Sequence, residues 1–120
     1  MDKAQAIQHF WEGFGLPAYD ENTVPADAET PYITYGVQTA GLNETVYPSA
    51  SLWYKSKRWD KISQKAEEIY NAIKTMPSTI KIDGGRMYIT TGTPFAQRMS
   101  DENDNIRRIL LQINIEFFTN

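Results

Sequence analysis

The stretch that decides the fold runs from Trp59 to Met76 and reads WDKISQKAEEIYNAIKTM. Its apolar residues recur at steps of three and four, which places them on one face of a helix; they are Trp59, Ile62, Ala66, Ile69, Ile73 and Met76. Ser56 can cap the start of this segment, and Pro77 ends it because proline cannot continue a helix. The spacing therefore predicts an amphipathic helix over about 58–76, roughly 28 Å long at 1.5 Å per residue.

Strand patterns lie on both sides of this helix. Ahead of it, residues 32–37 and about 45–55 alternate side chains between two faces. Pro48 lies inside the second of these patterns and cannot donate a ladder hydrogen bond, so it predicts an edge or a bulge. After the helix, residues 79–90 are centred on Asp83-Gly84-Gly85, a tight turn that needs a positive φ, and they predict a hairpin.

The longest strand pattern closes the chain. Over about 106–118, apolar side chains occupy every second position from Ile109 to Phe117. A strand of this length would reach about 40 Å, so we expect it to bend or to project. A short helix over 2–14 and irregular loops over 17–31 and 91–105 account for most of the remaining chain.

These elements indicate the fold class. Strands joined by short turns form a mostly antiparallel sheet, and the apolar face of the long helix must be buried against it. The chain has 120 residues, the length of one domain. We therefore expect a single domain over 1–120 of the α+β class, with two layers: a mostly antiparallel β-sheet covered by one long helix, plus a short N-terminal helix.

Composition removes several classes of chemistry. The chain has no cysteine and a single histidine, His9, which excludes disulfides, thiolate metal sites and multi-histidine metal centres. No apolar run approaches the 18 residues of a membrane span, so no membrane partner is expected. The formal net charge of −3 argues against a dedicated nucleic-acid binder.

No catalytic or ligand-binding motif is present. The acidic run Asp101-Glu102-Asn103-Asp104-Asn105 fails the calcium-loop pattern, because Ile106 stands where glycine is needed and Gln112 where glutamate is needed. The glycine clusters do not fit a dinucleotide or phosphate loop. We therefore expect no catalytic residues, no metal and no cofactor. A basic-aromatic group could stack on nucleic acid, but it fits the start of a helix better; its members are Lys55, Lys57, Arg58, Lys61, Trp53 and Trp59.

Charge is unevenly distributed along the chain. Residues 1–30 carry six acids against Lys3, and residues 61–100 carry six bases against three acids. Two opposed patches on one small domain would suit head-to-tail contact between copies. A mixed, solvated surface is the alternative interpretation.

Several strings resemble one family of assembly proteins. The quoted stretches are Pro31-Tyr32-Ile33-Thr34-Tyr35, Ser49-Ala50-Ser51-Leu52-Trp53-Tyr54, Trp59-Asp60-Lys61-Ile62, Pro94-Phe95-Ala96-Gln97-Arg98-Met99-Ser100-Asp101 and Gln112-Ile113-Asn114-Ile115-Glu116-Phe117. Together with a leading segment that ends near Leu16-Pro17-Ala18-Tyr19, they resemble the tail terminator (tail completion) proteins of long-tailed bacteriophages and prophages. The similarity covers about residues 7–118.

The resemblance implies a structural protein of the virion, assembled in the bacterial cytoplasm and located at the head-proximal end of the tail. It implies a homo-hexameric ring that caps the tail tube, stops its growth and offers a docking face to the head-completion (neck) protein, while DNA passes through without specific binding. The family carries no catalytic residue to this sequence, so no enzyme activity is expected.

The contact residues are predicted from the two loops. Flexible segments that combine apolar and charged side chains suit binding to other proteins; the candidates are Tyr19, Asp20, Phe95, Gln97, Arg98, Met99 and Asp101. Two other functions stay open at this point. One is a head-completion, connector or minor capsid protein of the same joint, and the other is a small ligand-binding or enzymatic domain, which would need a deep pocket lined by titratable groups.

Overall fold

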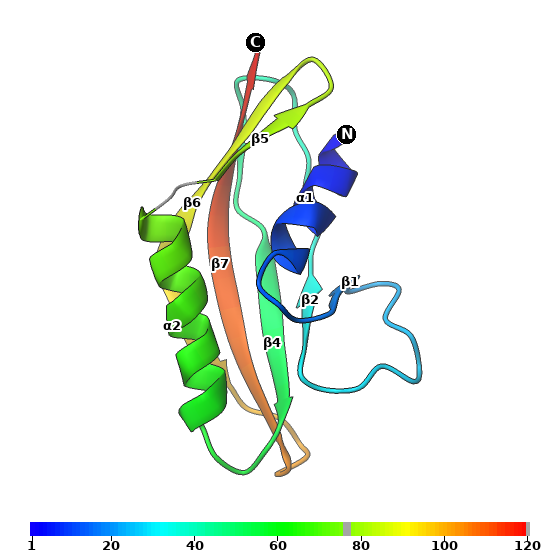
Figure 1. Cartoon of the computed structure of the whole chain (residues 1–120), viewed down its shortest axis with the longest axis vertical. Helices are drawn as coiled ribbons and strands as arrows, with labels where there is room; N and C mark the ends of the chain where they lie inside the picture. The colour runs from blue at the N-terminus through cyan, green and yellow to red at the C-terminus, as the bar shows by residue number, and fades with distance from the viewer. Residues whose placement is uncertain (76–77, 120) are drawn as a thin grey trace.

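The computed structural model describes residues 1–75 and 78–119, and within them it has an α+β fold (Figure 1). A seven-stranded sheet has the order β1-β2-β4-β7-β6-β5, and β3 pairs with β7 beyond the start of β4. The helices are α1 (Lys3–Glu12) and α2 (Asp60–Thr75). The strands are β1 (Ala18–Asp20), β2 (Tyr32–Tyr35), β3 (Thr45–Val46), β4 (Ser49–Lys55), β5 (Ser78–Ile82), β6 (Gly85–Met99) and β7 (Ile106–Thr119).

The central strand is β7, the last strand of the chain. It pairs with β4 and β3 on one side and with β6 on the other. The predicted alternation is confirmed, because every second side chain from Ile109 to Phe117 is buried in the core. The domain measures 46 Å along its longest axis, and β7 runs along most of this length (Figure 1).

Both helices pack on the same face of the sheet, which we call the helix face. Helix α1 begins with a capping box, in which the Asp2 carboxylate accepts from the Gln5 N–H at 2.8 Å and the Gln5 side chain accepts from the Asp2 N–H at 3.0 Å. Its Phe10 and Trp11 are buried. Helix α2 buries the stripe from Ile62 to Ile73 that the spacing predicts. Met76 and Pro77, the expected end of this helix, lie outside the described residues.

The expected architecture, a two-layer and mostly antiparallel sheet covered by one long helix, is wrong. The sheet is mixed, because β1 runs parallel to β2. It is also curled, and two helices share its face (Figure 1). At 1.5 Å per residue the 16 residues of α2 span about 24 Å, whereas the 15 residues of β6 would span about 50 Å if the strand were straight and regular. One helix is therefore too short to cover strands of this length, and α1 packs on β1, β2 and β5.

Two of the expected connections are also wrong. Residues 91–99 were expected in a loop over 91–105, but they continue β6. The loop expected over 17–31 contains β1, a strand of three residues. In both places proline and polar residues conceal the strand, because short or irregular edge strands lack a clear period of two. Pro48 does mark an interruption, since it separates β3 from β4.

The alternation on β7 predicts unequal effects for two adjacent leucines. Leu111 is fully buried on the helix face, whereas Leu110 lies partly exposed on the other face. Leu111→Ala should lower the free energy of unfolding by about 2–5 kcal/mol, because it leaves a cavity in the core. The matched control Leu110→Ala should cost less than about 1.5 kcal/mol. Urea denaturation of both variants checks this, and equal losses would contradict the assignment of the two faces.

Candidate functional site

The end strands of the sheet are β1 and β5, and beyond β5 a part of β6 is open as well. Strand β5 pairs with β6 only from Gly85 to Ile89, so among the described residues the stretch Thr91–Met99 has β7 alone as a strand partner. We call this stretch the β6 edge. At the other end of the sheet, β1 pairs with β2 and with no other described strand, and we call Ala18–Asp20 the β1 edge. Open edges carry backbone groups that are free to pair with another chain.

A groove runs beside the β6 edge, between that strand and α2. Its volume is about 460 Å³. Its floor includes the Phe95 ring, which is 9% exposed and lies 5.3 Å from the Tyr70 ring. Its rim includes the charged side chains of Glu67, Lys74 and Arg98. The groove therefore combines an aromatic floor with a charged rim, next to an open strand.

Four of the predicted contact residues lie on the β6 edge rather than in a loop. Phe95 is buried, so it shapes the groove and offers little contact surface of its own. Gln97 and Arg98 are exposed. The Arg98 guanidinium lies over the Trp59 ring at 4.7 Å, which fixes it on the helix face. Met99 stands opposite Arg108 on the outer face, the face that the helices leave free.

Tyr19 and Asp20 lie on the β1 edge, at the opposite end of the sheet. Tyr19 is on the outer face, where its ring meets the Tyr32 ring edge-on at 5.7 Å. Asp20 is on the helix face, and its carboxylate accepts from the Asn22 N–H at 2.9 Å. The structure thus separates the sequence-predicted residues into two groups that lie at the β1 edge and the β6 edge.

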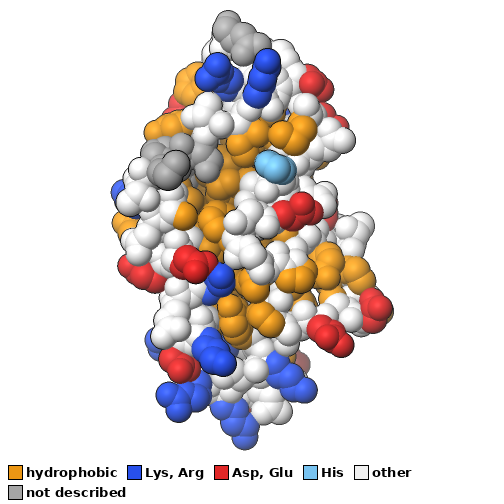
Figure 2. Space-filling view, in the orientation of Figure 1, with side chains coloured by type: hydrophobic (Ala, Val, Ile, Leu, Met, Phe, Trp, Pro, Cys, Tyr) orange, Lys and Arg blue, Asp and Glu red, His pale blue; other side chains and the backbone are white. Residues whose placement is uncertain are grey.

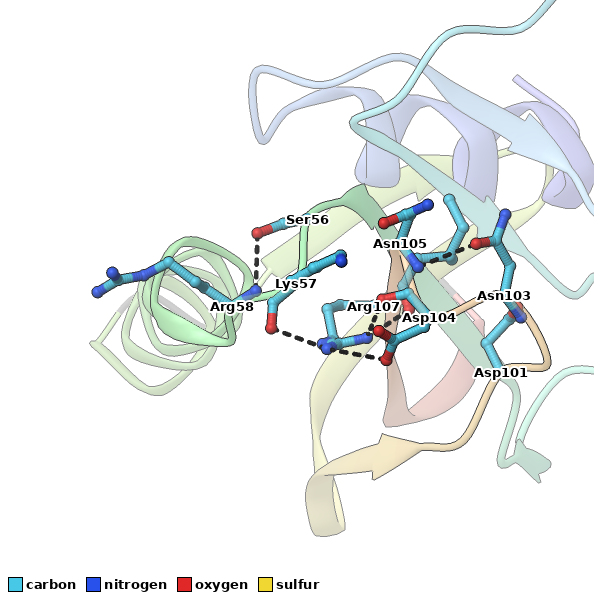
Figure 3. A network of polar contacts seen from close by, with 9 residues as sticks. Ser56, Lys57, Arg58, Asp101, Asn103, Asp104, Asn105 and Arg107 are labelled. Carbon is cyan, nitrogen blue, oxygen red and sulfur yellow. Dashed lines mark hydrogen bonds and ion pairs between the residues drawn. The ribbon is translucent and has the colours of Figure 1, made fainter.

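Asp101 belongs to neither edge and holds the loop between β6 and β7. Its carboxylate accepts from the Asn103 N–H at 2.9 Å, and the Asn103 side chain accepts from the Asn105 N–H at 2.9 Å (Figure 3). The Asn105 carbonyl accepts from the Ser56 N–H at 2.7 Å, which ties this loop to the start of α2. These local bonds are typical of Asx turns.

Arg107 completes the connection between the two loops. Its guanidinium donates to the carbonyls of Asp104 at 2.9 Å and Lys57 at 2.8 Å, and it lies 5.4 Å from the centre of the Trp59 ring (Figure 3). Trp59 therefore contacts both Arg98 and Arg107. The basic-aromatic group of the sequence is in part a structural connection at this end of the sheet.

The outer face carries a row of side chains that sequence reasoning missed. Tyr32, Trp53 and Arg108 stand opposite one another on β2, β4 and β7. The Tyr32 and Trp53 rings are 6.4 Å apart, and the Arg108 guanidinium lies 4.8 Å over Trp53. Aromatic residues at alternate strand positions were the available signal, but the strand order that aligns them could not be read from the chain.

Two polar side chains are buried beneath this row. Thr34 is 8% exposed and accepts from the Trp53 indole N–H at 2.8 Å. Ser51 is 4% exposed and accepts from the Arg108 guanidinium at 3.0 Å. Their hydrogen bonds offset the cost of removing the hydroxyls from water.

Charged side chains gather in different parts of the molecule. The exposed acids Glu21, Asp27 and Glu29 lie on the segment that joins β1 to β2, and together with Asp20 we call them the acidic flank. Lys and Arg gather instead at the end of the molecule where β4 stops and α2 starts (Figure 2).

The described part of the chain was searched for metal-binding clusters and for membrane-spanning helices. Nowhere in residues 1–75 and 78–119 do three His, Cys, Asp or Glu side chains come together to hold a metal ion. Neither described helix has the length and apolar character needed to cross a bilayer.

Comparison with known proteins assigns no family. No protein-family model matches the sequence, and no curated protein matches it at a significant level. The resemblance to tail terminators therefore remains a prediction.

The Arg107 connection can be tested by comparing two arginines. Arg107 retains 15% of its side-chain exposure and Arg58 retains 79%. Arg107→Met should lower the free energy of unfolding by about 1.5–3 kcal/mol, because charged hydrogen bonds to backbone carbonyls are lost. The control Arg58→Met should change it by less than about 0.5 kcal/mol. Urea denaturation distinguishes the two, and a loss that is equally small for both would show that the connection is not stabilising.

Tyr35 lies beside the β1 edge, and its ionisation makes the free energy of unfolding depend on pH in the alkaline range. Burial raises the pKa of its phenol above the ordinary value, and the carboxylates of Asp20 and Glu12 raise it further. The folded protein therefore holds this proton more tightly than the unfolded chain does. That contribution is complete below the unfolded pKa of about 10 and is lost as the pH rises through the folded pKa.

Tyr35→Phe should flatten the decline in stability above pH 10, as measured by thermal unfolding between pH 8 and pH 11. The exposed Tyr47, at 69% exposure, supplies the control Tyr47→Phe. If Tyr47→Phe flattened the decline as much as Tyr35→Phe, the buried phenol would not be its source.

Proposed function

We propose that the protein is a subunit of the ring that ends the tail tube of a long-tailed bacteriophage or prophage. In this role it is a structural protein and not an enzyme. One face of the ring binds the last ring of tube protein and stops its growth, and the other face binds the head-completion protein. The protein is therefore expected in the virion, at the head-proximal end of the tail.

The observation that carries the proposal is the position of the β1 edge and the β6 edge. They lie on opposite sides of one sheet, and their surroundings differ, because the β1 edge is followed by the acidic flank whereas the β6 edge adjoins the groove. A closed ring of identical subunits needs a heterologous contact, in which two different surfaces of each subunit meet. Two unlike surfaces that face opposite ways meet this requirement, whereas a two-fold dimer would need one self-complementary surface.

The sequence supports the same role independently. The family-like strings extend over about residues 7–118 and include both the β1 edge and the β6 edge. The net charge of −3 suits a channel through which DNA must pass, because like charge prevents the polyanion from adhering.

The proposal is tested on the tail tube itself. In phage particles that lack this protein, tail tubes should grow beyond their normal length and should fail to join heads. Purified protein added to polymerising tube protein of the same phage should stop elongation. Light scattering of the purified protein should give a mass near six times 13.7 kDa, and if the ring forms only on tubes, six copies should be bound at each tube end.

The outcome also distinguishes the neighbouring roles. Tubes of normal length that still fail to join heads would contradict the terminator role and favour a head-completion protein. Tubes of normal length that join heads normally would contradict both the terminator role and the head-completion role.

A further inference from the structure

The β6 edge offers a short and well-defined pairing segment. A bulge lies between Thr91 and Ala96, and Pro94 within it cannot donate a backbone hydrogen bond. Beyond the bulge, regular pairing with β7 resumes from Ala96 to Met99. A strand added to this edge would therefore pair along these four residues. The β1 edge, with three residues, is of matching length.

The side chains of the two edges also match by face. Arg98 stands opposite the buried Ile109, and Asp20 stands beside the buried Tyr35, so both belong to the helix face. Met99 and Tyr19 belong to the outer face, since their neighbours in the sheet are Arg108 and Thr34. In a sheet that continued from one edge to the other, Asp20 would lie on the same side as Arg98, and Tyr19 on the same side as Met99.

Charge selects this contact over pairing of like edges. Two β1 edges would bring two acidic flanks together, which is unfavourable. Placed against the β6 edge, the acidic flank instead meets a rim on which the two cations Arg98 and Lys74 outnumber the one acid, Glu67. Opposite charge thus favours a head-to-tail contact between two copies of the chain.

We propose that the β1 edge of one copy pairs with the β6 edge of the next, so that a single sheet continues from subunit to subunit. Because β6 runs antiparallel to β1 within one copy, the two edges pair antiparallel, with Asp20 opposite Arg98 on the helix face and Tyr19 opposite Met99 on the outer face. This inference rests on the proposed ring and identifies the surfaces that build it. The partner is a second copy of this chain, and the acidic flank lies against the groove beside α2.

The absence of cysteine from the chain permits a direct test. The variant with both Tyr19→Cys and Met99→Cys should form, under mild oxidation, a ladder of covalent dimers, trimers and larger species on a denaturing gel. Each single variant should stay monomeric, because its one cysteine faces a position without a thiol. In the control, Arg86→Cys replaces Met99→Cys; Arg86 lies on the part of β6 that β5 covers, so no ladder should form.

Charge reversal gives a second test of the contact, in which no cysteine is introduced. Arg98→Asp should raise the concentration of half-association by about tenfold. Adding Asp20→Arg to this variant should recover most of the loss, because the two charges are exchanged. Arg86→Asp, an equal change on the covered part of β6, should leave association within about twofold.

Each outcome of these experiments supports or contradicts the proposed contact between the β1 edge and the β6 edge. Covalent dimers from a single-cysteine variant would show two-fold association and overturn the proposal. The lack of a ladder would also overturn the proposal, whether light scattering finds an oligomer or a monomer. A ladder without arrest of tube growth would support the contact between copies and contradict the terminator role. Arrest of tube growth without a ladder would support the terminator role and contradict this contact.

Discussion

The rest of the structure depends on the alternation of side chains along β7. Its inward residues form the middle of the core, and its backbone joins β3 and β4 on one side to β6 on the other. Because a shift of one residue would exchange the two faces, burial of the isoleucines fixes the register of every neighbouring strand. The same register determines that Trp53 meets Arg108 and that Arg98 lies on the helix face. The features of both open edges thus follow from one row of apolar contacts.

The elements with a strong period were predictable, and the short or irregular ones were not. The stripe from Ile62 to Ile73 and the row from Ile109 to Phe117 are repeated signals, so α2 and β7 could be predicted from the chain. The two edges carry no such signal, because β1 has three residues and β6 continues through Thr93 and Pro94. The coverage of the sheet was mispredicted for a related reason. A last strand longer than the helix was expected to bend or project, whereas β6 pairs with it over most of its length and extends the sheet beyond the reach of one helix.

The candidate site shows the same division. Sequence reasoning singled out the segments around Tyr19 and Arg98 but expected them in loops, and it counted Phe95 among exposed residues although its ring is buried against Tyr70. The row formed by Tyr32, Trp53 and Arg108 was missed altogether. These residues are distant in sequence, and their meeting depends on the strand order β2-β4-β7, which no local pattern encodes. Contacts set by topology need the fold before they can be seen.

The buried hydroxyls beneath that row have a consequence for the part of the outer face around them. Thr34 and Ser51 already have protein donors in Trp53 and Arg108, so neither hydroxyl depends on solvent for its hydrogen bond. These two hydroxyls can be dehydrated at low cost, because little hydrogen bonding to water has to be given up. The aromatic rings beside them would meanwhile gain from leaving water. Around Thr34 and Ser51 the hydration layer can therefore be exchanged for another surface without rearrangement of either hydroxyl, whereas the charge of Arg108 would require a polar partner on that surface.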